Sequence, residues 1–244
     1  MTPLPTFPAF AGLDIKGITP PLKLAHFKLI AFDMDSTLIN MECVDEIAAA
    51  IGRKAEVAAI TEAAMQGDID DYKQSLRQRV ALLKGVTLAQ IDLLRHQRMQ
   101  LNPGAAELVA ACQAAGLKVL LVSGGFTHFS DDVCARLGID FSRANVLEVA
   151  HGVLTGRMVD QAWGDICDGA EKRKMLLETC RGLGVSPQQA IVVGDGANDI
   201  PMMGVAGLSV AYHAHPAVRA IAQVGIHAGG LDRLLEIFRP VRFN

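Results

Sequence analysis

The sequence predicts an α/β fold, with a Rossmann-like core of parallel strands, helices on both faces and a helical cap inserted after the first strand. Apolar runs at residues 29–32, 117–122 and 190–193 are bounded by turn residues and separated by stretches of helix length, as is typical of buried parallel strands. Residues 44–100 have helical periodicity and no convincing strand. We therefore expect a core over 26–43 and 101–244, a cap over 44–100 and a loosely ordered leader over 1–25.

Helix signals recur along the cap. Its periodicity predicts four helices, over 44–51, 55–65, 72–83 and 88–99. Thr87 and Gln90 have the spacing of a capping box, which favours a helix start at that point.

The core elements that follow have their own signals. Asn102 can cap a helix that has Pro103 at its first position and Gly116 just past its end. Residues 146–149 and 153–158 flank His151-Gly152, which predicts a hairpin because glycine adopts positive φ readily. A fourth apolar run, 208–211, is expected to join the parallel strands.

Composition narrows the class of protein. The chain has 244 residues, half of them hydrophobic, which is enough for a large core and hence for an enzyme. Its formal net charge of −3 leaves no basic footprint for a nucleic acid. The most apolar long window, 108–126, is interrupted by Gln113, Gly116 and Lys118, so we expect no membrane span. The leader has no secretory pattern, and five scattered cysteines predict reduced thiols in a cytoplasmic protein.

Polar residues follow three of the predicted strands, and parallel strands deliver such residues to one rim of a sheet. These residues are Asp33, Ser123 and Asp195. Asp33 and Asp35 are close enough in sequence to repel each other unless a cation or proton intervenes. Mg²⁺ suits this position because it prefers oxygen ligands and bridges carboxylates to substrate phosphates. The alternative is an ordinary turn in which Asp and Ser satisfy backbone groups.

The segment from Gly194 to Asp199 adds two further acids beyond a strand. Its first two glycines match a dinucleotide-binding fingerprint, but Asp199 occupies the third glycine position and would repel pyrophosphate. A plain turn with an Asn/Asp cap is the structural alternative.

Two other features suit a phosphate. Ser123-Gly124-Gly125 offers a hydroxyl and unhindered backbone N–H groups at an expected helix start, although a tight turn without a ligand would look the same. Lys172 lies in a charged helix start that would usually be a solvated face. A phosphate among several aspartates needs positive charge beyond one divalent ion, and Lys172 can supply it.

Taken in order, these segments resemble the phosphoserine phosphatases of the haloacid dehalogenase superfamily. The matching pieces are Asp33-Met34-Asp35-Ser36-Thr37, Ser123-Gly124-Gly125-Phe126, Lys172 and Gly194-Asp195-Gly196-Ala197-Asn198-Asp199, and the resemblance spans about residues 28–230. It implies a Mg²⁺-dependent phosphomonoester hydrolase that releases serine and phosphate from phosphoserine in serine biosynthesis.

The same resemblance implies roles. Asp33 would be the nucleophile that forms an aspartyl-phosphate, and Asp35 the acid and then the base. The implied metal ligands are the Asp33 carboxylate, the Asp35 backbone carbonyl and Asp195, with Asp199 orienting a metal-bound water or Lys172. Ser123, Gly124, Lys172 and Asn198 fall at substrate-binding positions.

Two cap-side positions match the phosphoserine-specific pattern. Glu42 would bind the substrate ammonium and Arg79 its carboxylate, whereas an ordinary helix acid and a solvated arginine are the alternatives. Arg77 competes with Arg79 because both lie in one predicted helix. Tyr72 falls where this family often places a bulky aromatic, and an interfacial tyrosine is the alternative.

Other classes of protein share parts of this pattern. A related enzyme could act on phosphothreonine or another small phosphomonoester, or pass phosphate to an acceptor such as homoserine. An ion pump shares the aspartyl-phosphate chemistry but needs membrane helices. A non-catalytic phosphate-binding domain would lack at least one of Asp33, Asp35, Lys172 and Asp195, and all four are present. His213-Ala214-His215 has metal-site spacing without a further Cys or His nearby, so we interpret it as a loop before a helix opened by Pro216.

Overall fold

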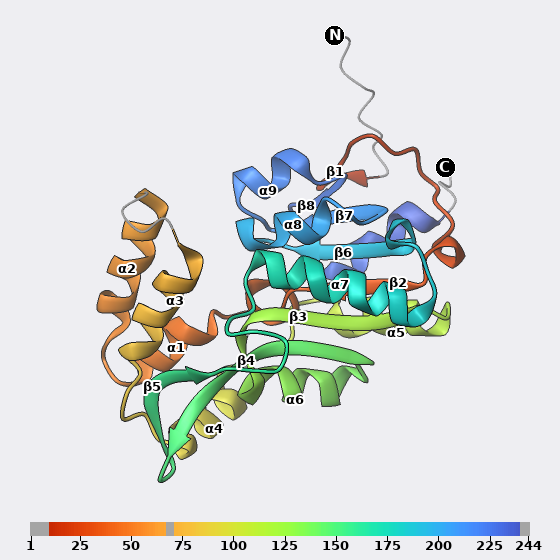
Figure 1. Ribbon diagram of the computed structural model, residues 1–244. Helices are drawn as coiled ribbons and strands as arrows, with labels where there is room; N and C mark the ends of the chain where they lie inside the picture. Colours follow the sequence, from red (N-terminus) through yellow and green to blue (C-terminus); the bar gives the residue numbers. More distant parts are fainter. Residues whose placement is uncertain (1–9, 67–70, 240–244) are drawn as a thin grey trace.

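The computed structural model describes residues 10–66 and 71–239 and is built on a sheet of eight strands (Figure 1). From one edge to the other the strands are β1 (Leu13–Ile15), β8 (Val224–Ile226), β7 (Leu208–Tyr212), β6 (Ala190–Gly194), β2 (Leu29–Phe32), β3 (Lys118–Phe126), β4 (Phe141–Ala150) and β5 (Val153–Val159). The pairs from β8 to β4 are parallel, and the two edge pairs are antiparallel. The predicted α/β class is confirmed.

Helices cover both faces of this sheet. One face packs against α5 (Ala105–Ala114), α6 (Thr127–Leu137) and η6 (Leu231–Phe238), and the other against α7 (Gly169–Leu183), α8 (Ile200–Met203) and α9 (Pro216–Ile221). In β2 the side chains alternate between the two cores, as a strand requires: Ile30 and Phe32 face the first, Leu29 and Ala31 the second. Short turns of helix complete the core at η2 (Leu24–His26), η3 (Met34–Leu38), η4 (Pro187–Gln189) and η5 (Ala197–Asp199).

The four apolar runs form β2, β3, β6 and β7, as predicted. Two short strands were not predicted. One is β8, and the other, β1, lies within the stretch expected to be a loose leader and pairs with β8 along the sheet edge. Residues 1–9 of that expected leader lie outside the described residues, and residues 10–25 are described.

Among the described residues, four helices lie between η3 and α5: α1 (Cys43–Ala50), α2 (Lys54–Gln66), α3 (Tyr72–Ala81) and α4 (Leu88–Gln97). They match the predicted helices within a few residues, and the capping box of Thr87 and Gln90 is present. In Figure 1, α1, α2 and α3 stand beside the sheet, past the ends of its central strands. No helix of the described residues is long and apolar enough to cross a membrane.

The predicted hairpin is longer than expected and extends toward these helices. His151 and Gly152 both adopt positive φ at its turn, as a tight hairpin needs. Leu154 of β5 exchanges backbone hydrogen bonds with the segment after α3, accepting from Gly85 at 2.9 Å and donating to Val86 at 2.7 Å. The hairpin therefore adds a strand to the helical region, beyond the residues 44–100 expected to build it.

The expected role of Asn102 was wrong. Gly104, with φ 76°, precedes the first residue of α5, and Asn102 does not cap that helix. Its side-chain amide instead donates to the backbone carbonyls of Ser36, Thr37 and Ile39 at 2.8–3.2 Å. Asn102 therefore holds the loop that follows β2 in place. Gly116 lies past the helix end with φ 85°, as predicted.

Candidate active site

The central acid, Asp33, is delivered by the buried strand β2. Every residue of β2 is buried, and Asp33 follows at its carboxyl end with only 6% of its surface exposed. The chain then turns through η3, where Ser36 adopts φ 55°. One Asp33 oxygen accepts a hydrogen bond from the Met34 N–H at 2.7 Å. The other accepts no hydrogen bond from the described residues.

Lys172 reaches Asp33 from α7. Its Nζ lies 2.7 Å from Asp33 Oδ1 and 2.8 Å from Asp199 Oδ1, and its side chain is fully buried. Burial alone would lower the pKa of this amine, but the carboxylates of Asp199 and Asp33 raise it well above the ordinary value. The charged lysine is thus a fixed cation beside Asp33, and the solvated-face interpretation of Lys172 is wrong.

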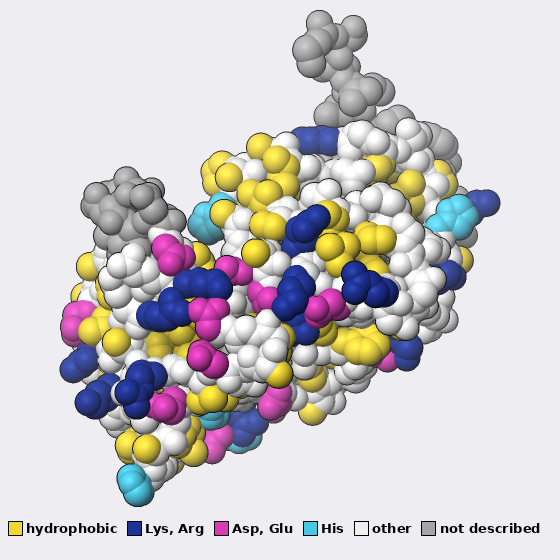
Figure 2. All heavy atoms as spheres, viewed as in Figure 1, with side chains coloured by type: hydrophobic (Ala, Val, Ile, Leu, Met, Phe, Trp, Pro, Cys, Tyr) yellow, Lys and Arg dark blue, Asp and Glu magenta, His cyan; other side chains and the backbone are white. Residues whose placement is uncertain are grey.

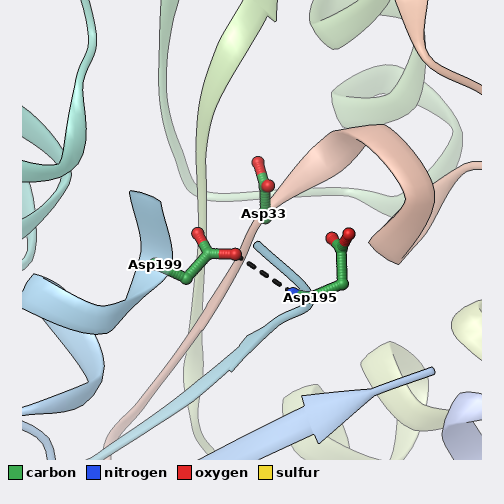
Figure 3. A group of neighbouring side chains, drawn as sticks. All are labelled: Asp33, Asp195 and Asp199. Atoms are coloured by element: carbon green, nitrogen blue, oxygen red, sulfur yellow. Dashed lines mark hydrogen bonds between the residues drawn. The ribbon is translucent and has the colours of Figure 1, made fainter. Parts of the chain in front are cut away.

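Asp195 and Asp199 complete a group of three acids with Asp33 (Figure 3). One ligand oxygen from each lies within 4.8 Å of the others. The second Asp199 oxygen accepts the backbone N–H groups of Asp195 and Gly196, each at 3.1 Å, so both of its oxygens have partners. Thr37 donates to one Asp195 oxygen at 2.7 Å. Asp199 therefore orders the loop and Lys172, and Asp33 and Asp195 each keep one oxygen for a ligand.

The positive charge of Lys172 does not balance the negative charge of these three acids. Burial raises the pKa of Asp33 well above its usual value, and the carboxylates of Asp199 and Asp195 raise it further against the effect of Lys172. Burial likewise raises the pKa of Asp195 to about 6. A divalent cation held by the free oxygens would favour the ionised form of both acids. The donor set, all carboxylate oxygen, suits a hard cation.

Asp35 lies on the other side of the turn and is held by α1. The Cys43 backbone N–H and thiol both donate to its carboxylate, at 3.2 and 2.9 Å. Burial, followed by the charge of Glu42, raises the pKa of Asp35 to about 7. A carboxyl group with this pKa can both give and take a proton near neutral pH.

A cavity of about 830 Å³ opens between the sheet and the helical region above it. Its lining includes most of the predicted site residues and several residues that the motifs did not single out: Asp33, Asp35, Ser36, Glu42, Val44, Asp45, Thr61, Tyr72, Ser75, Leu76, Arg79, Ser123, Gly124, Gly125, Asp195, Gly196, Ala197, Asn198 and His215. Lys172 and Asp199 lie beneath it. The site residues named from sequence are therefore brought together around one cavity.

The segment predicted to bind phosphate has a different structure from the one expected. Ser123, Gly124 and Gly125 continue β3 and do not form a turn at a helix start. The Ser123 hydroxyl accepts the Gly125 N–H at 2.8 Å, and Asn145 from β4 donates to the Gly124 carbonyl at 2.8 Å. The segment is thus a rigid cavity wall.

Glu42 and Arg79 line the cavity from the side of α1 and α3. Ser36 donates to Glu42 at 2.5 Å, and burial raises the pKa of this carboxyl group. The Arg79 Nε is buried and has no partner among the described residues. Arg77 instead pairs with Asp165 outside this cavity. Of the two arginines, Arg79 is the one available to a ligand in the cavity.

Sequence reasoning missed two supporting residues. Thr37 orients Asp195 and belongs to the quoted motif, so its place in that motif was the available signal. Cys43 holds Asp35 but had been predicted only to be one of five reduced thiols. All five cysteines are free, as predicted. His215 directly precedes Pro216, the first residue of α9, and the His215 backbone N–H donates to the Asp195 carbonyl at 3.1 Å.

The fold and this set of acids define a hydrolase of the haloacid dehalogenase-like class. The model of the haloacid dehalogenase-like hydrolase family matches residues 27–207, which is most of the chain, and the chain belongs to this family.

Individual relatives carry the name of one particular enzyme of this family. The chain is 74% identical over 229 residues to a phosphoserine phosphatase of Albidiferax ferrireducens, covering 94% of this chain and 97% of that one. It is 72% identical over 228 residues to a phosphoserine phosphatase of a Polaromonas species, covering 93% and 97%. A solved structure of a phospho-aspartyl intermediate analogue of phosphoserine phosphatase superimposes with a TM-score of 0.80 at 36% identity, covering 87% of this chain and 99% of that one.

Proposed function

We propose that this enzyme hydrolyses O-phospho-L-serine to L-serine and phosphate through an aspartyl-phosphate on Asp33. The observation that carries the proposal is the charge pattern of one cavity. Acids suited to phosphoryl transfer lie on its sheet side, and on its cap side lie the Glu42 carboxylate and the Arg79 guanidinium, whose Nε has no partner among the described residues. The relatives named above, which carry the name phosphoserine phosphatase, support the same substrate.

In the first half of the proposed reaction the Asp33 carboxylate attacks phosphorus, and the bond from phosphorus to the serine oxygen breaks. Asp35 gives its proton to that leaving oxygen. Lys172, which touches Asp33, offsets negative charge at the reacting centre. Ser123 and the backbone N–H of Gly124 lie on the cavity wall, where they can bind the phosphoryl oxygens.

In the second half, Asp35 takes a proton from water, which attacks the aspartyl-phosphate and releases phosphate. One group can serve both steps because the first leaves it deprotonated for the second. Its pKa of about 7 suits this exchange. The Cys43 contacts keep the carboxyl group directed at the cavity during both steps.

We propose Mg²⁺ as the cofactor. The free oxygens of Asp33 and Asp195, with the backbone carbonyl of Asp35, would hold it, and Asp199 would orient Lys172 and the metal-binding loop. When bound, the ion would neutralise charge on the transferring phosphoryl group.

The amino-acid part of the substrate would lie under the cap. Glu42 would bind the ammonium, and Arg79 the carboxylate through paired N–H groups. Tyr72 closes the same space from α3. Asn198 lies on the opposite wall, within reach of the phosphate end.

We accordingly propose that residues 44–100 act as a substrate-selecting cap on a core of 26–43 and 101–244. The reaction would supply serine in biosynthesis, in the cytoplasm, where free thiols persist.

Comparing substrates tests this proposal. Phosphate release from phosphoserine, phosphothreonine and phosphoethanolamine should be measured with Mg²⁺ and with EDTA. We expect phosphoserine to be strongly preferred and all release to stop in EDTA. Equal kcat/KM on the three esters would rule out an amino-acid clamp, and transfer of phosphate to added homoserine would point to a phosphotransferase.

A further inference from the structure

Asp165 joins the cap helix α3 to the core at a point outside the cavity. We propose that Asp165 is a positioning residue whose ion pairs with Lys73 and Arg77 hold α3 in the place where it binds substrate. This inference deepens the proposed function, on which its kinetic part rests.

The contacts are specific. Lys73 Nζ lies 2.8 Å from one Asp165 oxygen, and the Arg77 guanidinium pairs with the other. The first oxygen also accepts the Ile166 N–H at 2.9 Å, so the carboxylate has a fixed orientation. Lys73 lies 3.7 Å from Asp168 as well. Figure 2 shows Lys and Arg side chains mixed with Asp and Glu along the face between α3 and α7.

Helix α3 uses opposite sides for these contacts and for the cavity. Lys73 and Arg77 are four residues apart and therefore share one side of the helix. Tyr72, Ser75 and Arg79 line the cavity from the other. The outer pair therefore sets the rotation and depth at which the inner residues are presented. If the ion pairs of α3 with Asp165 were lost, Arg79 would no longer be held in its position at the cavity.

The covalent connections leave this position open to movement. The cap joins the core through two antiparallel segments, which pair where Ile39 meets Leu101. Asn40 and Asn102 add backbone hydrogen bonds there, to Gln100 at 3.0 Å and to Leu38 at 2.8 Å. This narrow connection can act as a hinge, because few backbone torsions need to change for the helices beyond it to move together with the β4–β5 hairpin, whose Leu154 is hydrogen-bonded to Gly85 and Val86. Asp165 lies in the segment that leads from β5 into α7 and does not line the cavity.

The core end of the contact is anchored next to the reacting acids. Asp168 caps α7 by accepting the Glu171 N–H at 2.8 Å, and one residue further on Lys172 binds Asp33. The Asp165 contact thus fixes α3 relative to the helix that holds the nucleophile. Exposed pairs of this kind contribute little to global stability and are screened by salt, so their effect is expected in local opening.

The test compares Asp165→Asn with Asp140→Asn in the full chain. Asp140 is a matched control, because it also pairs with a lysine, Lys118 at 2.6 Å, and accepts a backbone N–H, that of Val119 at 2.8 Å. Hydrogen exchange of the α3 amides is measured without substrate at low salt. We expect Asp165→Asn to speed exchange in α3 by about three- to tenfold, and Asp140→Asn to leave it unchanged. Added salt should bring wild type toward Asp165→Asn.

Kinetics and a charge swap complete the test. Asp165→Asn should raise KM for phosphoserine severalfold at low salt with little change in kcat. The double variant Lys73→Asp/Asp165→Lys should recover part of both effects. Unchanged α3 exchange in Asp165→Asn would overturn the inference whatever the substrate is. If hydrogen exchange of α3 behaves as expected but the wild-type enzyme does not hydrolyse phosphoserine, the result would instead count against the proposed function.

Discussion

The ammonium group of Lys172 lies 2.7 Å from Asp33 at the bottom of the cavity, and its side chain is fully buried. The same amine binds Asp199 at 2.8 Å, so it joins the end of β2 to the loop after β6. A buried lysine between two acids has no alternative partner in solvent. Its position therefore serves the stability of the site and its chemistry at once.

Replacing Lys172 with Met should lower both the stability of the protein and its catalytic rate. The change leaves Asp33 and Asp199 buried without their cation, which costs about 3 to 5 kcal/mol of stability, and it removes a charge from the reacting centre, which lowers kcat by at least about 10²-fold. Urea unfolding and phosphoserine turnover measure the two losses. Lys174→Met is the control, because Lys174 lies half-exposed on the same helix and should lose neither. A Lys172→Met protein with normal kcat would show that the charge is not used.

Arg79 and Arg77 predict different kinetics. Arg79→Ala should raise KM for phosphoserine about 10- to 100-fold, because a charged hydrogen bond to the substrate carboxylate is lost. It should change hydrolysis of phosphoethanolamine little, since that ester has no carboxylate. Arg77→Ala should have a much smaller effect at moderate salt, because Arg77 pairs with Asp165 outside the cavity. Similar KM values for the two variants would contradict the assignment of Arg79.

Gly124 and Tyr72 pack so closely that a larger side chain would not fit at either position. A Cβ on Gly124 would overlap the Tyr72 hydroxyl, while the ring carbon behind it lies at an ordinary 3.4 Å. Gly124→Ala should therefore reduce kcat/KM at least about tenfold by displacing Tyr72. Adding Tyr72→Phe removes the clashing oxygen and should restore much of the loss. A double variant as poor as Gly124→Ala would show that the glycine is needed for another reason.

Acid should weaken the Asp165 contact. The Lys73 hydrogen bond is the largest cause that lowers the pKa of Asp165, to about 2, with Arg77 also contributing. A depressed folded-state pKa gives stability that is complete above the unfolded value near 3.8 and is lost as pH falls toward 2. The difference in hydrogen exchange of the α3 amides between wild type and Asp165→Asn, corrected for the intrinsic pH dependence of exchange, should thus shrink between pH 5 and pH 2. A difference that is constant over this range would mean that Asp165 does not titrate in its contact.

Much of the fold could be predicted because long buried elements leave periodic patterns. The apolar runs of β2 and β6 and the cap helices are of this kind. The strands β1 and β8 have three residues each, too few for periodicity to register. Ser123 to Gly125 looked like a turn because glycine-rich segments usually are, but they lie inside β3, at the irregularity between Val122 and Phe126 in its pairing with β4.

The site was predictable where a residue type carries its own chemistry. Acids at strand ends and one lysine met that condition. Arg77 and Arg79 could not be separated from sequence, because both are cationic and the helix register is set by tertiary packing. Side chains two positions apart on a helix point about 200° away from each other, so only one of the two arginines could face the cavity. Cys43 had no signal at all, since its role depends on the fold bringing it to Asp35.

The central claim is that Asp33 carries the phosphoryl group. Wild type turning over ³²P-labelled phosphoserine with Mg²⁺ should be quenched in acid within milliseconds, digested and analysed for labelled peptides. The label should lie on Asp33, and Asp33→Asn, which keeps the shape of the side chain, should bind no label, lose about 10⁴-fold or more in kcat and remain folded. Label on another residue, or substantial turnover by Asp33→Asn, would contradict covalent catalysis at this position.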